Sequence, residues 1–179
     1  MIRWIALGVG GLIALTLLVA LIGFSLPQDH VAQSRARLSQ PPDSVWALVR
    51  DMATYPSWWS QLSSSEREVG ASGETWIQEG PRVGRLPIHI ESEEPPHRLV
   101  TRIGEGLPFG GRWTYEISPA GGGATLTVTE DGEIYNPIYR FVSRFLMGYH
   151  GTMDSYLVDL GRLFGEEVTP EHVPSGAGA

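Results

Sequence analysis

The sequence predicts an α+β protein in which an antiparallel sheet is closed by a C-terminal helix and preceded by an apolar helix. Three observations predict this. A long uncharged run fills most of the first thirty residues. The middle of the chain alternates apolar and polar residues between Gly- and Pro-rich turns, and residues 137–163 carry apolar side chains at helical spacing. The length of 179 residues is that of one domain with appendages.

The composition excludes several classes of function. The chain has no cysteine, which removes disulfides, thiolate metal sites and cysteine nucleophiles. All 13 cationic residues are arginine, so lysine Schiff-base chemistry is absent as well. The net charge of -7 argues against nucleic acid as a partner, because phosphate binding needs clustered positive charge.

The apolar run at the N-terminus predicts a membrane anchor over residues 1–27. Residues 4–26 carry no charge and exceed the roughly 20 residues that cross a bilayer core. A cleaved signal peptide is the alternative, with Gly23 and Ser25 as a weak cleavage site, but its apolar region is usually shorter. A buried core helix is the third interpretation, and the absence of a polar face argues against it.

The arginines flanking this run give a weak signal for orientation. Arg3 lies on one side, and Arg35 and Arg37 lie on the other. The short N-terminus and the early Arg3 favour a cytoplasmic N-terminus. We therefore expect a single-pass protein of a bacterial inner membrane with an extracytoplasmic domain.

Residues 28–165 are predicted to form one domain that opens with a strand and two short helices. The strand covers residues 30–39. Asp43 or Ser44 is positioned to cap a helix over residues 45–52, and residues 54–59 form a turn or a second short helix. The strand-like segments that follow are short and separated by turns, and they cover residues 74–78, 85–91, 98–103, 112–117 and 124–130. Such strands favour an antiparallel sheet.

A long amphipathic helix is predicted after the sheet. Asn136 is a good N-cap and Pro137 a good first helical residue. Gly148 and Gly151 lie within the helical pattern and indicate a bend or a close contact. The Pro- and Gly-rich residues 166–179 are predicted to be a disordered tail.

The order of these elements resembles the START-like (SRPBCC) superfamily of polyketide cyclase/dehydrase and lipid-transport proteins. The resemblance covers roughly residues 30–165. It rests on three segments and on the long helix that follows them: PDSVWALVRD at residues 42–51, YPSWW at 55–59 and EPPHRLV at 94–100. Each segment alone is a weak signal, and their order and spacing are more specific.

The resemblance implies a helix-grip fold, in which a curved antiparallel sheet wraps the long C-terminal helix around a cavity. Members of the superfamily bind lipids, sterols, polyketides or other apolar molecules there, and some are cyclases or hydrolases. The superfamily has no single catalytic signature, so no catalytic residue is carried over. We expect no cofactor, no metal and no nucleic-acid partner. The oligomeric state stays open.

Aromatic residues are the predicted wall of the ligand site. In a helix-grip fold the core and the cavity wall are partly the same surface, so the aromatic residues either fill the core or contact an apolar ligand. The residues expected to contact a ligand are Trp76, Trp113, Tyr115, Tyr149 and Tyr156.

Two titratable residues are weak catalytic candidates. Glu130 shares a strand face with Leu126 and Val128, so it would be a buried acid or base if that face points inward. Arg102 or Arg112 would otherwise neutralise it, or the strand simply ends there. His150 is either a base or a boundary residue at the edge of the helix.

The other signals favour ordinary structural roles. His89, His97 and His150 have no compact metal-ligand spacing. His89 is expected to face solvent. The loop at residues 107–111 is either a gate, a membrane contact or an ordinary glycine turn.

Three functions follow from these observations. The first is a membrane-tethered carrier or sensor for a hydrophobic small molecule or lipid. A wide, dry pocket would favour this function. The second is a cyclase- or hydrolase-like enzyme, favoured by Glu130 or His150 meeting another polar group in an open pocket. The third is an interaction module whose cavity is filled by its own side chains.

Overall fold

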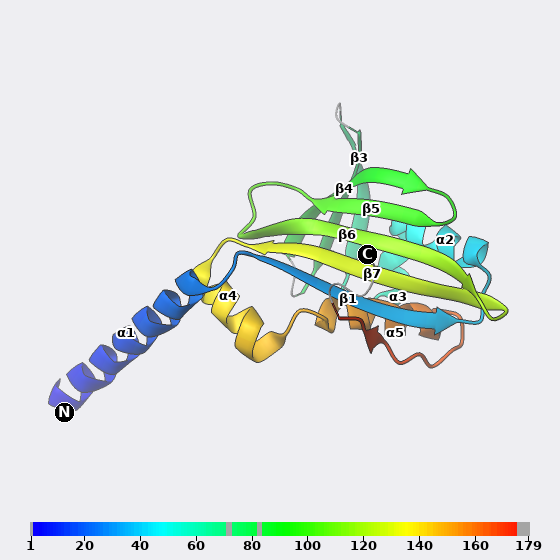
Figure 1. The fold of residues 1–179 in the computed structure, drawn as a ribbon. Helices are drawn as coiled ribbons and strands as arrows, with labels where there is room; N and C mark the ends of the chain where they lie inside the picture. The colour runs from blue at the N-terminus through cyan, green and yellow to red at the C-terminus, as the bar shows by residue number, and fades with distance from the viewer. Residues whose placement is uncertain (1, 71–72, 82–83, 175–179) are drawn as a thin grey trace.

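A computed structural model describes residues 2–70, 73–81 and 84–174 (Figure 1). Eight antiparallel strands form one curved sheet in the order β2-β3-β4-β5-β6-β7-β1-β8. The strands are β1 (Asp29–Leu38), β2 (Ser64–Gly70), β3 (Gly73–Gly80), β4 (Gly84–Glu94), β5 (Arg98–Ile103), β6 (Phe109–Ala120), β7 (Gly123–Ile134) and β8 (Glu171–His172). The predicted α+β class with a curved antiparallel sheet and a C-terminal helix is confirmed.

The inner face of the sheet follows from the alternation along its two longest strands. Trp113 of β6 pairs with Glu130 of β7, and Tyr115 pairs with Val128. These pairs lie on the face that packs against helix α5 (Gly151–Leu163), whose Tyr156 belongs to the same buried cluster. The strand pattern had predicted these faces because side chains alternate with a period of two.

Two short helices close one end of the sheet. They are α2 (Pro42–Arg50) and α3 (Tyr55–Trp58), joined by a 3-10 turn at Met52–Thr54. The helix α2 begins earlier than expected, with Pro41 at the N-cap position and no side-chain cap. The predicted cap at Asp43 or Ser44 is therefore wrong. Pro42 at the first helical position already has the φ that starts a helix.

The predicted continuous C-terminal helix is broken into two. Helix α4 (Pro137–Val142) runs into a π-helical turn, η2 (Ser143–Met147), and then stops. Gly148 has φ 74° and ψ -178°, which no helix can continue through. Helix α5 starts afresh at Gly151. The expected N-cap is confirmed, since Asn136 accepts hydrogen bonds from the backbone N–H groups of Ile138 and Tyr139.

The predicted disordered tail at residues 166–179 starts too early in the chain, because residues 166–174 pack against the domain. Strand β8 pairs with β1 at Ser34 and Arg35, and the carboxylate of Glu166 accepts hydrogen bonds from the backbone and hydroxyl of Ser39. These bonds satisfy backbone and side-chain groups at the edge of the sheet, which the Pro- and Gly-rich composition did not indicate. Residues 175–179 lie outside the described residues.

Helix α1 (Ile2–Ser25) projects away from the sheet and meets it beside α4 (Figure 1). Its stretch Leu7–Ser25 is long and apolar enough to cross a membrane, although a signal sequence would pass the same test. Its last turn lies against α4, where a Cβ added to Gly23 would overlap the carbonyl oxygen of Pro137. The guanidinium of Arg140 donates to the carbonyl oxygens of Ile134 (2.7 Å) and Leu26 (3.4 Å).

Candidate functional site

Six aromatic rings fill the space between α5 and the inner face of the sheet. Tyr156, fully buried on α5, lies at their centre. The centroids of the other five rings are 5.2–6.2 Å from its own, and they belong to Tyr55, Trp58, Trp59, Trp113 and Tyr115. We call these six residues the aromatic cluster. Rings at such distances and mostly steep angles make favourable edge contacts.

The structure brings together three of the five predicted ligand residues. Trp113, Tyr115 and Tyr156 belong to the aromatic cluster. Tyr149 lies apart, with its ring stacked on His30 at 4.0 Å. Trp76, on β3, donates its indole N–H to Glu74 at 2.8 Å. A role in ligand binding remains a prediction for all five residues.

The tyrosine hydroxyls within the cluster are protonated. The hydroxyl of Tyr55 donates to the carbonyl oxygen of Val49 at 2.6 Å and lies 3.1 Å from that of Tyr156. Burial raises the pKa of Tyr55, Tyr115 and Tyr156 well above the ordinary value, because the charged form loses its hydration. These groups are therefore neutral hydrogen-bonding groups and poor bases.

One donor inside the cluster has no partner among the described residues. The indole Nε1 of Trp59 is buried and makes no hydrogen bond there, and Trp59 as a whole is 7% exposed. Its neighbour Trp58 differs, because its Nε1 donates to the hydroxyl of Thr54 at 3.4 Å. Buried donors are usually paired, so the Trp59 N–H is a natural place for an acceptor to bind. The aromatic pattern alone could not single out Trp59.

Glu130 points inward, which is the condition set for its candidate role, and it meets two other side chains. Its carboxylate accepts from the indole N–H of Trp113 at 3.1 Å and lies 3.2 Å from Nε2 of His30. The other ring nitrogen of His30, Nδ1, is buried without a partner among the described residues. His30 and Glu130 lie 100 residues apart, so the register of β1 against β7 was needed to find this pair.

The alternative in which Arg102 or Arg112 neutralises Glu130 is wrong. Arg102 and Arg112 both pair with Glu91 instead, and their hydrogen bonds hold the pKa of that carboxyl below its usual range. They are opposite one another in the β5–β6 register, next to Trp113 but on the other face. His89 is opposite Arg102 on that outward face, with its Nδ1 2.8 Å from the hydroxyl of Thr75.

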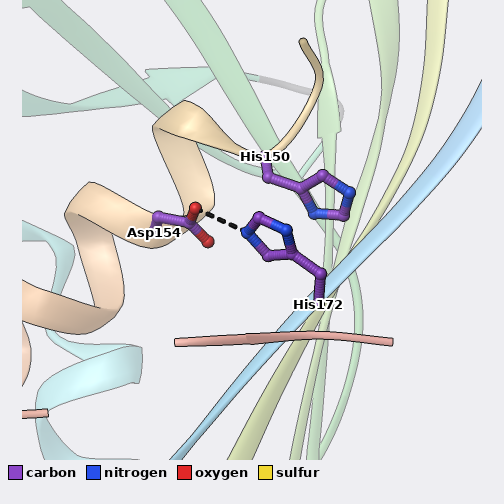
Figure 2. Close-up of side chains that lie close together, drawn as sticks. All are labelled: His150, Asp154 and His172. Carbon is purple, nitrogen blue, oxygen red and sulfur yellow. Dashed lines mark hydrogen bonds and ion pairs between the residues drawn. The ribbon is translucent and has the colours of Figure 1, made fainter. Parts of the chain in front are cut away.

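His150 joins a second polar cluster at the start of α5. One nitrogen from each of His150 and His172 and a carboxylate oxygen of Asp154 lie within 4.8 Å of one another (Figure 2). His172, from β8, binds the Asp154 carboxylate at 2.8 Å, and its ring stacks on His150 at 3.8 Å. Buried Ser34 donates to Asp154 at 2.7 Å and lies 3.2 Å from Nδ1 of His150.

This second cluster has the donor types that Zn²⁺ accepts, although the histidine spacing predicted no metal site. In the structure His172 bonds Asp154 directly, and Ser34 links Asp154 to His150, so the cluster also serves to hold the tail against β1 and α5. Burial, and the nearby His172, lower the pKa of His150. His150 is therefore mostly neutral near pH 7, and it lies just before α5 instead of on the helix as predicted.

Surface pockets of the described structure lie away from the aromatic cluster. One, of about 240 Å³, lies between β1 and the tail near Arg37 and Val168, and another lies near Gln61 and Pro81. Neither is lined by a predicted ligand residue. Between α5 and the inner face of the sheet, the described interior is occupied by the rings of the aromatic cluster.

Comparison with known proteins identifies the family. Residues 29–154, well over half of the chain, match the model of a family described as polyketide cyclase/dehydrase and lipid transport. No curated protein matches the chain.

Solved structures share the fold at low sequence identity. A conserved protein from Geobacillus kaustophilus is 15% identical, covers 80% of this chain and 100% of its own, and has a TM-score of 0.62. Truncated norcoclaurine synthase from Thalictrum flavum is 12% identical over 76% of this chain and 93% of its own, at 0.61. A START superfamily protein from Mycobacterium smegmatis is 14% identical over 75% of this chain and 99% of its own, at 0.56.

These structures have the arrangement found here, a curved antiparallel sheet closed by a C-terminal helix. The family match and this shared fold together confirm the resemblance seen in the sequence. The chain belongs to the polyketide cyclase/dehydrase and lipid transport family and has its START-like, helix-grip fold.

Proposed function

We propose that this protein binds an apolar molecule bearing a hydrogen-bond acceptor between α5 and the inner face of the sheet, while α1 tethers it to a membrane. The indole N–H of Trp59 inside the aromatic cluster, which has no partner in the described part of the chain, carries the proposal. A buried donor without a partner costs about 1–3 kcal/mol. A carbonyl or ether oxygen on the ligand would recover that cost.

The packed interior has to open for a ligand to enter. An interior occupied by its own side chains would by itself favour an interaction module. The Trp59 N–H, without a partner among the described residues, argues against that interpretation. The segment between η2 and α5 is a natural place for opening. Gly148 ends one helix there, and half-buried Tyr149 rests on His30 through a stacking contact. Displacing Tyr149 would uncover His30 and Glu130 on the inner face.

The tether supports a ligand that comes from the bilayer. Helix α1 is long and apolar enough to span, and almost none of it is buried in the domain. Holding the domain at the membrane raises the local concentration of lipid-derived molecules around it. Family membership supports an apolar ligand without naming it.

The test is ligand retention by the full chain purified from its host and sprayed from nanodiscs for native mass spectrometry. We expect a bound apolar molecule of defined mass. Trp59→Phe removes the N–H and should lower its affinity about tenfold, the equivalent of one hydrogen bond. Trp58→Phe is the matched control, since its N–H already has a partner.

The result that would overturn the proposal is a clean apo mass with no thermal shift across a panel of lipids and polyketides. Equal loss of ligand in the Trp58→Phe and Trp59→Phe variants would instead remove Trp59 Nε1 from the site.

A second candidate is acid–base catalysis by His30 and Glu130. The observation in its favour is their 3.2 Å contact on the inner face. A carboxylate that orients a histidine is a common general-base arrangement. Glu130→Gln should then abolish turnover of any substrate found, while Glu91→Gln on the outward face should not. Unchanged turnover in Glu130→Gln would exclude this role.

A further inference from the structure

A group of exposed apolar side chains covers α4 and η2. It consists of Ile138, Tyr139, Phe145, Leu146 and Met147, which we call the apolar patch. Leu146 and Met147 are 74% and 75% exposed, as much as Leu21 and Phe24 in the last turns of α1, at 69% and 70%. Soluble monomeric proteins rarely expose a contiguous group of large apolar side chains, and such a group usually marks an interaction site.

The segment that carries the patch has positive charge and no acidic residue, unlike the chain as a whole. The protein has a net charge of -7, yet no acidic residue occurs between Glu133 and Asp154. The charged side chains of α4 and η2 are two arginines. Arg140 is held by carbonyl oxygens, whereas Arg144 is exposed at the edge of the patch. Apolar and aromatic side chains flanked by arginine are typical of helices lying in a membrane interface.

The patch is fixed at the end of α1. Gly23, in the last turn of α1, lies directly against Pro137, the first residue of α4. Arg140 reaches Leu26, just beyond α1. Figure 1 shows α4 and the end of α1 side by side at the edge of the domain. If α1 crosses a bilayer, α4 and η2 lie at the depth of its last turn, where hydrocarbon meets headgroups.

We propose that α4 and η2 form a second membrane contact, with the apolar patch inserted into the interface of a phospholipid bilayer and Arg144 directed to anionic headgroups. The inference rests on the membrane tether of the proposed function. A bilayer is favoured over a second copy of the chain because the patch continues the exposed surface of α1. The contact places Gly148 and Tyr149, next to His30, close to the lipid.

Quenching by spin-labelled lipids tests this contact, and the cysteine-free sequence allows clean single-site labelling. The full chain in nanodiscs would carry one environment-sensitive fluorophore, after Leu146→Cys in the patch, Leu15→Cys in α1 or Arg85→Cys on the domain. Arg85 is an exposed control, at 62% of its side chain. We expect quenching at position 146 by shallow doxyl lipids, at position 15 by deep ones, and none at position 85.

The outcomes separate the two ideas. Quenching at position 15 but not at position 146 would refute the membrane contact of α4 and η2 and would still support α1 as the tether. Quenching at 146 but not at 15 would support the surface contact and remove the spanning helix. A position 146 shielded from water but unquenched by lipid would point to a second copy of the chain. As a further check, Arg144→Glu should reduce quenching at 146 in anionic nanodiscs and not in neutral ones.

Discussion

Asp159 of α5 holds the loop after α3 against the helix. It is 5% exposed, and it accepts hydrogen bonds from the backbone N–H of Ser60 at 2.9 Å and from its hydroxyl at 2.6 Å. Its third partner, Arg162, has a side chain that is 71% exposed. The buried carboxylate therefore matters mostly through Ser60, because an exposed ion pair contributes little.

Asp159→Ala should lower the free energy of unfolding by about 2–3 kcal/mol, since it removes the two hydrogen bonds that Ser60 donates to the carboxylate. Arg162→Ala should cost less than about 1 kcal/mol. Denaturant unfolding of the detergent-solubilised chain, followed by tryptophan fluorescence, would measure both. Equal losses in the two variants would mean that the ion pair, and not Ser60, is what stabilises the fold.

His150 gives the protein a dependence on mild acid. Its pKa lies below the ordinary 6.5, mainly because burial disfavours the charged ring, and His172 adds repulsion while Asp154 and Glu130 oppose it. The unfolded chain therefore takes up this proton at a higher pH than the folded chain does. The stability from this group is complete above about pH 6.5 and falls as the pH drops through the folded pKa.

We expect the wild-type chain to lose more thermal stability between pH 7 and pH 5 than His150→Gln does. His172→Ala should have a smaller pH effect than wild type, because a repulsive charge is gone. A His150→Gln variant with the same pH profile as wild type would show that other groups govern this range. Thermal unfolding in nanodiscs at several pH values is the measurement.

Residue roles could be predicted from the sequence only as far as local periodicity reaches. The alternation along β7 correctly placed Glu130 on the same face as Leu126 and Val128, and the structure shows that this face points inward. Its partner His30 lies 100 residues away, so the pair depends on the register between β1 and β7, which no local pattern contains. For the same reason the alternative that paired Glu130 with Arg102 or Arg112 is wrong, because both arginines lie on the opposite face.

Among the elements, the break before α5 is the clearest departure from periodicity. Apolar residues continue at helical spacing across it, so the pattern predicted one helix. The two glycines marked the place, but the left-handed φ of Gly148 decides that the helix stops. The same break leaves α4 and η2 outside the helix-grip core, and it carries Tyr149 over to His30.

Two glycine substitutions in this segment should have opposite effects. Gly148→Ala has room for the methyl group but strains the backbone at φ 74°, so we expect a loss of about 1–2 kcal/mol. Gly151→Ala meets nothing within 4 Å and is the first residue of α5, so we expect a gain of about 0.5–1 kcal/mol. Unfolding free energies in denaturant would measure both, and a neutral Gly148→Ala would mean the segment readily rearranges.

For the molecule as a whole, the strand alternation, the turns and the order of elements were enough to predict the fold and its family. The state of the interior could not be predicted. Whether aromatic side chains line a cavity or fill it depends on how side chains from three separate segments, residues 55–59, β6 and α5, meet at Tyr156. The patch on α4 and η2 could not be predicted either, because Ile138 and Phe145 fit the apolar stripe expected of one continuous helix.

The sidedness of the domain is a prediction at this scale. With the short N-terminus in the cytoplasm, protease added to spheroplasts should digest the domain, while intact cells should protect it. A domain that stays protected in spheroplasts, and is digested only after lysis, would reverse the orientation. An epitope on the C-terminus would report the cleavage.

The tail that ends in β8 also covers one edge of the sheet, which bears on pairing between copies of the chain. β1 would be the last strand of the sheet without it, and the exposed edge of a sheet is a template on which another chain can add a strand. β8 and Val173 occupy that edge at Gln33, Ser34 and Arg35. Chains shortened before Glu166 would therefore tend to pair edge to edge, and tethering would concentrate them in one plane, where such pairing grows into clusters.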